Sequence, residues 1–194
     1  MGAMAILGVK WGLMRRQKES NKANLARVKG DPQASLQIIE FIDFQCPACA
    51  NGAMFLKKVI GENPGIISLQ MKYFPLSMHR HANSAAVYAE CAARQEKFWP
   101  FQDIILERQQ QWTNLNDEEV KNFFNQTAKE VEIKEREFQS CLKDDAVKEI
   151  ILAEKEEGSK LGVQSTPTYF INGQIFVGPR ALSAELEKYI KPQP

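Results

Sequence analysis

The chain has 194 residues, enough for one domain with a well-formed core or for one domain that carries a large insertion. Its 25 basic and 24 acidic residues leave a net charge of +1, which gives no electrostatic reason to expect a nucleic-acid partner. No apolar run approaches the ~18 residues that a membrane span needs. Four cysteines are too few for a disulfide scaffold, so each is interpreted individually.

Residues 1–33 are expected to form an extension outside the folded core. Residues 1–4 (MGAM) are typical of a cloning scar, so the natural start is expected to be missing. A short apolar run over residues 5–14 contains Lys10, and a polar, helix-forming stretch follows it. Three interpretations of the extension stay open: a disordered leader, a docking or oligomerisation helix, and the trimmed end of a membrane anchor.

A strand, a helix and a second strand are predicted after the Gly-Asp-Pro break at residues 30–32. Residues 36–44 are almost continuously apolar, which is typical of a strand covered on both faces in a parallel sheet. A helix is predicted over residues 47–60, with proline in its first turn, and a second strand over residues 66–74. This order predicts that the two strands are parallel.

Helical signals dominate residues 81–161. About five helices are predicted there, over residues 82–94, 98–108, 120–131, 134–142 and 146–161. A hairpin is then predicted over residues 168–177, because Asn172-Gly173 suits a two-residue type I′ turn, and a closing helix over residues 181–190. The fold class is therefore α/β: residues 34–80 and 162–194 form a mixed sheet flanked by helices, and residues 81–161 form a helical insertion.

The sequence Cys46-Pro47-Ala48-Cys49 lies where the first strand gives way to the helix. Unpaired backbone N–H groups and the positive end of the helix dipole favour a thiolate there, so the pKa of Cys46 is expected to fall well below ~8.5. Cys49 lies about one helical turn further on, close enough to form a disulfide with Cys46. Cys46 is therefore predicted to be the exposed nucleophile, and Cys49 the sheltered thiol that resolves a mixed disulfide.

Two other interpretations of this cysteine pair compete with redox chemistry. A zinc site would need a second pair of ligands, and the sequence offers only His79 and His81, so no metal and no cofactor are expected. An inert structural disulfide is the other alternative. The position between a strand and a helix favours redox chemistry.

Glu40 lies between Ile39 and Phe41 in the strand that is predicted to be buried on both faces. Desolvation of a carboxyl group there is expected to raise its pKa. Six residues before Cys46, Glu40 is placed to exchange a proton with Cys49. The alternative is a glutamate at a sheet edge that reaches solvent. A neighbouring acid, Asp43, is nearer the strand end and is expected to be solvated.

Residues 40–49 (EFIDFQCPAC) and 165–173 (STPTYFING) resemble the DsbA-like thiol–disulfide oxidoreductases of the thioredoxin superfamily. The resemblance spans about residues 33–191 and is looser in the helical block. It implies a thioredoxin fold interrupted by a helical insertion, with Cys46 as the attacking thiol and Cys49 as the resolving thiol. It also implies that Glu40 is the buried acid of the family.

The same resemblance implies that Thr166-Pro167 forms a cis-proline loop that faces the two cysteines. The loop backbone would then pair with an extended client, so Pro47, Ala48, Thr166 and Pro167 are the expected substrate-binding residues. If the compartment is oxidising, as the family implies, Cys91 and Cys141 are expected to form a structural disulfide. The alternative from the residues alone is two buried free thiols.

The predicted function is disulfide donation to reduced or folding client proteins in a bacterial periplasm or at another extracytoplasmic face, with or without an anchor. A quinone-linked membrane protein is the expected partner that reoxidises the pair. Ala48 removes a side chain that would help to stabilise the thiolate, and Thr166 also occurs in isomerases and reductases of the superfamily, so the direction of electron flow stays open. An isomerase or reductase that oligomerises through its N-terminal segment is one rival, and a thioredoxin-like peptide-binding chaperone is another.

Overall fold

The computed structural model describes residues 20–190, and within them a five-stranded mixed sheet has the strand order β1-β3-β2-β4-β5. The strands are β1 (Val28–Gly30), β2 (Leu36–Ile42), β3 (Ile67–Tyr73), β4 (Thr168–Ile171) and β5 (Gln174–Val177). Strands β2 and β3 are parallel, as the predicted strand–helix–strand order requires. Strands β1 and β5 are the edges and pair antiparallel with their neighbours, which leaves β2 in the centre of the sheet.

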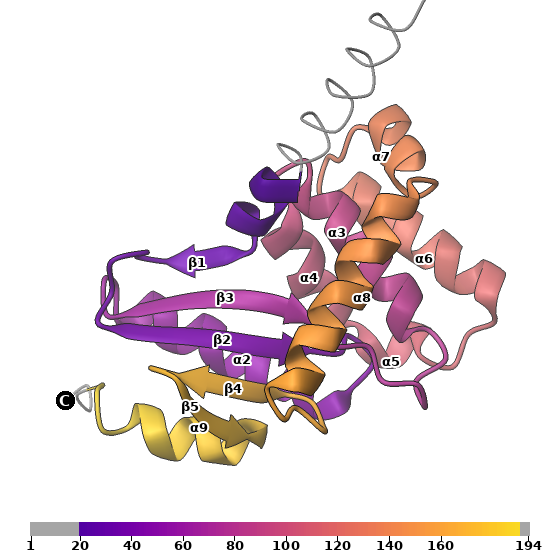
Figure 1. Cartoon of the computed structure of the whole chain (residues 1–194). Coiled ribbons are helices and arrows are strands. Elements are labelled where there is room, and N and C mark those ends of the chain that lie inside the picture. The colour runs from indigo at the N-terminus through magenta and orange to yellow at the C-terminus, as the bar shows by residue number, and fades with distance from the viewer. Residues whose placement is uncertain (1–19, 191–194) are drawn as a thin grey trace, which may run out of the picture.

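Helices lie on both faces of this sheet, and further helices form a bundle beside it (Figure 1). They are α2 (Pro47–Glu62), α3 (Ala82–Ala93), α4 (Phe98–Glu107), α5 (Gln109–Trp112), α6 (Asp117–Glu130), α7 (Glu135–Cys141), α8 (Asp145–Lys160) and α9 (Gly178–Leu186). In Figure 1, α8 crosses in front of the central strands and α2 lies behind them. The α/β class and the thioredoxin-like architecture predicted from the sequence are therefore confirmed.

Helix α8 approaches the sheet closely because residue 158 is glycine. A Cβ atom at Gly158 would lie 2.8 Å from ring atoms of both Phe41 and Phe74, closer than ordinary van der Waals contact. Phe41 is completely buried, and its ring packs edge-on against Phe74. The carboxyl-terminal half of β2 is therefore enclosed on both faces, which explains its nearly continuous apolar sequence.

The helical insertion is crosslinked. Cys91 in α3 and Cys141 in α7 form a disulfide with an S–S distance of 2.01 Å, so the pairing expected from the family resemblance is present. Within the insertion, the rings of Phe101, Phe124 and Phe138 are completely or almost completely buried and pack together. The prediction of about five helices missed the short helix α5, because its sequence, QQQW, has no apolar period.

The sheet begins before the expected end of the N-terminal extension at residue 33. Residues 20–26 are helical, and β1 then pairs with β3. Arg27 is 1% exposed, and its guanidinium donates to both carboxylate oxygens of Glu154 in α8, at 2.7 and 2.9 Å. Its Nη1 also donates to the Met71 carbonyl at 2.9 Å. This part of the predicted extension therefore belongs to the folded core.

Residues 1–4, expected to be a cloning scar, and the apolar run over residues 5–14 lie outside the described residues. Within residues 20–190, no helix combines the length and the apolar character required to cross a bilayer.

Candidate active site

The two cysteines of the Cys-Pro-Ala-Cys sequence occupy the first turn of α2. Cys46 is the N-cap residue and has extended backbone angles (φ −78°, ψ 120°), and Pro47 is the first helical residue. The Cys46 carbonyl accepts hydrogen bonds from the N–H groups of Cys49 at 3.0 Å and Ala50 at 3.3 Å. Cys46 is 8% exposed and Cys49 is completely buried. Cys46 is thus the more accessible thiol, but it is more enclosed than the sequence suggested.

The surroundings of the two thiols drive their pKa values in opposite directions. The thiol of Cys49 donates a hydrogen bond that lowers the pKa of Cys46 to about 5, and the Thr166 side chain and nearby backbone N–H groups act in the same direction against the effect of burial. Burial raises the pKa of Cys49 well above its usual value. At neutral pH the dithiol form therefore holds one thiolate, at Cys46, and one thiol, at Cys49.

The Thr166-Pro167 loop, 120 positions further along the chain, contacts this pair. The Thr166–Pro167 peptide bond is cis, and in its thiol form Cys46 donates to the Thr166 carbonyl over 3.3 Å. The Thr166 hydroxyl is buried and has no hydrogen-bond partner among the described residues. Pro47 is exposed and Ala48 partly buried, whereas Pro167 is buried. The fold therefore gathers the substrate-binding residues expected from the sequence around Cys46.

Glu40 is completely buried in β2, the central strand, so the alternative of a glutamate at a sheet edge is wrong. It lies opposite Met71 on one side and Tyr169 on the other. Burial raises the pKa of Glu40 to about 8, and the Tyr169 hydroxyl opposes that shift by a smaller amount. The negative charge of an ionised Glu40 also contributes to the raised pKa of Cys49, after burial and the interaction with Cys46.

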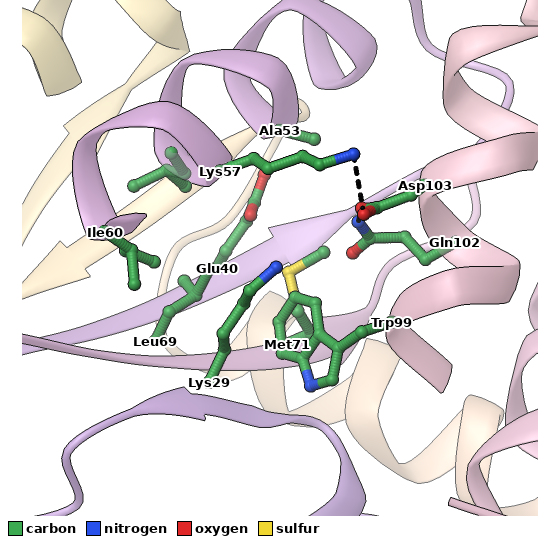
Figure 2. Close-up of a pocket in the computed structure, with 11 residues that line it drawn as sticks. Lys29, Glu40, Ala53, Lys57, Ile60, Leu69, Met71, Trp99, Gln102 and Asp103 are labelled. Carbon is green, nitrogen blue, oxygen red and sulfur yellow. Dashed lines mark hydrogen bonds and ion pairs between the residues drawn. The ribbon is translucent and has the colours of Figure 1, made fainter. Parts of the chain in front are cut away.

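A cavity of about 10 Å³, room for about one water molecule, adjoins Glu40 (Figure 2). Neither carboxyl oxygen of Glu40 has a hydrogen-bond partner among the described residues. Figure 2 shows the carboxyl group directed toward the Lys57 side chain, whose Nζ forms an ion pair with Asp103 Oδ2 at 2.9 Å. Lys57 is about half exposed. The cavity therefore lies between α2 and α4, with the buried acid and the half-exposed Lys57 both in its lining.

A network of polar groups holds the turn before Cys46, and Asp43 is at its centre. Asp43 is 1% exposed, so the expectation that it is solvated is wrong. Its carboxylate accepts hydrogen bonds from the N–H groups of Gln45 at 2.7 Å and Leu76 at 2.8 Å, and lies 2.8 Å from Nδ1 of His79. Aspartate that accepts from the N–H two residues ahead is a recognised turn signal, so the sequence Asp43-Phe44-Gln45 could have indicated this turn.

Among residues 20–190 no three His, Cys, Asp or Glu side chains come together as ligands for a metal ion. The site brings together two unequal thiols, a buried carboxyl group and the cis-proline loop.

Comparisons with known proteins agree with this architecture. The thioredoxin family model matches residues 22–192. A probable disulfide bond formation protein D of Bacillus anthracis is 26% identical over 152 residues, which cover 75% of this chain and 69% of that protein. The Na(+)/H(+) antiporter NhaA 3 of Salinispora tropica is 26% identical over 158 residues, 81% of this chain, and the chain spans only about a quarter (23%) of its length.

Among solved structures, α-DsbA1 from Wolbachia pipientis superimposes with a TM-score of 0.70 at 21% sequence identity. The match covers 84% of this chain and 89% of that one. At this identity, the likeness concerns the fold.

Proposed function

The chain belongs to the thioredoxin family, and on that premise we propose that it is a thiol–disulfide oxidoreductase that donates the Cys46–Cys49 disulfide to client proteins. The observation that carries the proposal is the difference between the pKa values of the two thiols. The pKa of Cys46 is lowered to about 5, and burial raises that of Cys49. A thiol of low pKa is a good leaving group, so a disulfide that contains it is readily given away.

The reaction begins with the oxidised pair. A client thiolate attacks Sγ of Cys46, the Cys46–Cys49 bond breaks, and Cys49 leaves with the electron pair. Glu40, whose raised pKa of about 8 keeps it protonated at neutral pH, supplies a proton to the departing Cys49. A second client thiolate then attacks the client sulfur of the mixed disulfide and releases Cys46 as a thiolate. The client has lost two electrons and the cysteine pair has gained them.

The residues around Cys46 are suited to holding an extended client. Pro47 is exposed beside the sulfur, Ala48 is small, and Thr166 and Pro167 lie opposite. We infer that the client pairs with the backbone of the Thr166-Pro167 loop as an added strand. Backbone pairing of this kind accepts many sequences, which suits an enzyme that acts on folding proteins.

The Cys91–Cys141 disulfide supports an oxidising, extracytoplasmic location, because structural disulfides persist mainly in such compartments. In that setting the reduced pair has to return its two electrons to an acceptor. A quinone-linked membrane protein is the proposed acceptor. The name of the Bacillus anthracis relative, a probable disulfide bond formation protein, agrees with the proposed direction.

The reduction potential of the Cys46–Cys49 pair tests this proposal. Equilibration with glutathione buffers should give a potential near the roughly −120 mV of strong disulfide donors rather than the roughly −270 mV of reductases. The protein should also oxidise a reduced, unfolded client, and Cys46→Ser should abolish that activity. A potential near the reductase value would assign the protein to reduction or isomerisation. If Cys46→Ser/Cys49→Ser keeps full activity on unfolded clients, the peptide-binding chaperone is correct.

A further inference from the structure

The short helix α5 of the helical insertion packs against the turn that carries Cys46. Its sequence begins with three consecutive glutamines, of which only the first is buried: Gln109 is 7% exposed, whereas Gln110 and Gln111 face solvent. Trp112 at the end of α5 is completely buried, and its Nε1 donates to the Ile105 carbonyl at 2.7 Å. Helix α5 is therefore anchored, and the position of Gln109 is fixed by packing.

Both hydrogens of the Gln109 side-chain amide are directed at the active-site turn. Its Nε2 donates to the Phe44 carbonyl at 2.8 Å and to the Cys46 carbonyl at 3.0 Å. A second contact runs in the opposite direction, because Gln45 Nε2 donates to the Thr113 carbonyl at 3.3 Å. Hydrogen bonds therefore run in both directions between the turn and α5. Gln109 donates to the residues on either side of Gln45, and Gln45 donates to the residue that follows α5.

We propose that Gln109 is a positioning residue for Cys46, through which the helical insertion holds the Cys46 backbone in register with the first turn of α2. The Cys46 carbonyl accepts hydrogen bonds from the N–H groups of Cys49 and Ala50 in α2. The amide of Gln109 donates to the same oxygen from α5, so the carbonyl is held from both helices. With the carbonyl fixed, the sulfur stays at the helix N-terminus and within reach of Thr166. Gln109 therefore acts on Cys46 through its backbone, because the geometry of that backbone decides how the sulfur meets the N–H groups of the first turn of α2.

The inference deepens the proposed function and rests on it only for the role of Cys46. The substitution Gln109→Met tests it, because methionine keeps the length and apolar stem of glutamine but has no donor. Loss of these hydrogen bonds should raise the apparent pKa of Cys46 by about half a unit to one unit. The pH profile of Cys46 alkylation by iodoacetamide measures this pKa when mass spectrometry resolves the Cys46 peptide from those of the other cysteines.

Gln110→Met is the matched control, because it makes the same chemical change one residue later on an exposed side chain. It should leave the Cys46 profile at the wild-type midpoint. If Gln109 has a merely structural role, Gln109→Met will change the melting temperature and leave the midpoint of Cys46 alkylation in place. That result would overturn the proposal. The proposed function fails separately, if the wild-type midpoint itself lies near ~8.5.

A measurement on the unaltered protein covers the case in which Gln109→Met does not fold. The side-chain amide protons of Gln109 should shift in NMR spectra with the same midpoint as Cys46 ionisation, and those of Gln110 should not. If the Gln109 amide protons show no response across that midpoint, the proposal is wrong.

Discussion

Residue-level electrostatics at this site come from groups that differ sharply in their access to water. Cys46 keeps contact with solvent and gains hydrogen-bond donors, which favours its thiolate. Cys49 and Glu40 are completely buried, and both are held in their neutral forms because desolvation penalises charge. The three groups thus share two protons at neutral pH, and the charge of Glu40 is felt at Cys49, the sulfur that has to leave as a thiolate.

Replacing Glu40 by glutamine should stabilise the protein at neutral pH. The pKa of Glu40 is about 8 in the folded protein, above its ordinary value of 4.5. Ionisation of Glu40 therefore leaves the free energy of unfolding unchanged below pH 4.5 and lowers it progressively as the pH rises toward 8. At pH 7 Glu40→Gln should therefore raise the free energy of unfolding by roughly 3 kcal/mol, because glutamine cannot ionise. Urea unfolding at pH 4 is the control, since both side chains are neutral there. An equal gain at the two pH values would contradict the prediction.

Removing the Thr166 hydroxyl should raise the pKa of Cys46. The Thr166 side chain is buried beside Cys46, and it is one of the groups that lower the pKa of Cys46. Thr166→Val preserves the shape and removes the donor, so we expect a rise of about half a unit to one unit in the midpoint of thiolate absorbance at 240 nm. Thr168→Val is a comparison on the same segment, because the Thr168 hydroxyl donates to the Ser165 carbonyl instead. A similar rise in both variants would point to a general disturbance of the loop.

At the scale of elements, close approach of helices to the sheet shapes the site. Gly158 lets α8 reach Phe41 and Phe74, and Gly52 makes room in α2 for the Tyr169 hydroxyl, which a Cβ atom would overlap. Tyr169 lies opposite Glu40 in the sheet. Gly158 therefore brings α8 against β2, the strand that leads to Cys46, and Gly52 brings α2 against Tyr169 of the neighbouring strand β4.

Gly158→Ala should destabilise the protein although alanine is the better helix former. The new Cβ atom would lie 2.8 Å from two buried rings, and overpacking of this kind costs about 1–3 kcal/mol. Gly61→Ala in α2 is the matched control, because nothing lies within 4 Å of its added Cβ atom. That control should gain about 0.4–1 kcal/mol, measured by urea unfolding. The packing account fails if both variants are stabilised.

The Cys91–Cys141 disulfide joins α3 to α7 across 50 positions of the chain. Replacing both cysteines by alanine should lower the free energy of unfolding by roughly 4 kcal/mol, because the unfolded chain regains the entropy of that loop. The redox potential of Cys46 and Cys49 should stay the same, since the crosslink lies within the insertion. A changed potential in the folded variant would show that the crosslink also influences the active site.

At the scale of the whole molecule, redox state and stability are coupled through Cys46. The pKa of Cys46 in the folded protein, about 5, is below its ordinary value of 9.0. A folded pKa below the unfolded pKa stabilises the reduced form. The gain is complete above pH 9, partial at pH 7 and absent below about pH 5. The short Cys46–Cys49 loop restricts the unfolded chain less than a long loop would.

The reduced protein should therefore melt above the oxidised protein near neutral pH, by roughly 5 °C. The difference should shrink between pH 7 and pH 5. Melting curves of both forms test this, with the Cys91–Cys141 disulfide kept intact and verified by mass spectrometry. If the oxidised form melts clearly higher at pH 7, the protein does not act as a disulfide donor.

The sequence alone determined the features that depend on neighbouring residues. The apolar run through Ile42, the Asn172-Gly173 turn and the position of Cys46 at a strand–helix junction all follow from local patterns. The assignment of Glu40 to a buried strand follows from the same run of residues. These elements lie within one to three residues of their predicted ends at most boundaries, because propensity and period act over short distances.

Only the tertiary structure decided which distant residues complete the site. Asp43 looked solvated from its neighbours, yet Leu76 and His79 from beyond β3 enclose it. Gln109 belongs to a polar stretch without a pattern, and it acquires a role only because α5 packs against the Cys46 turn. Hydrogen bonds between segments more than 30 positions apart leave no period in the sequence, since they depend on how the elements pack in space.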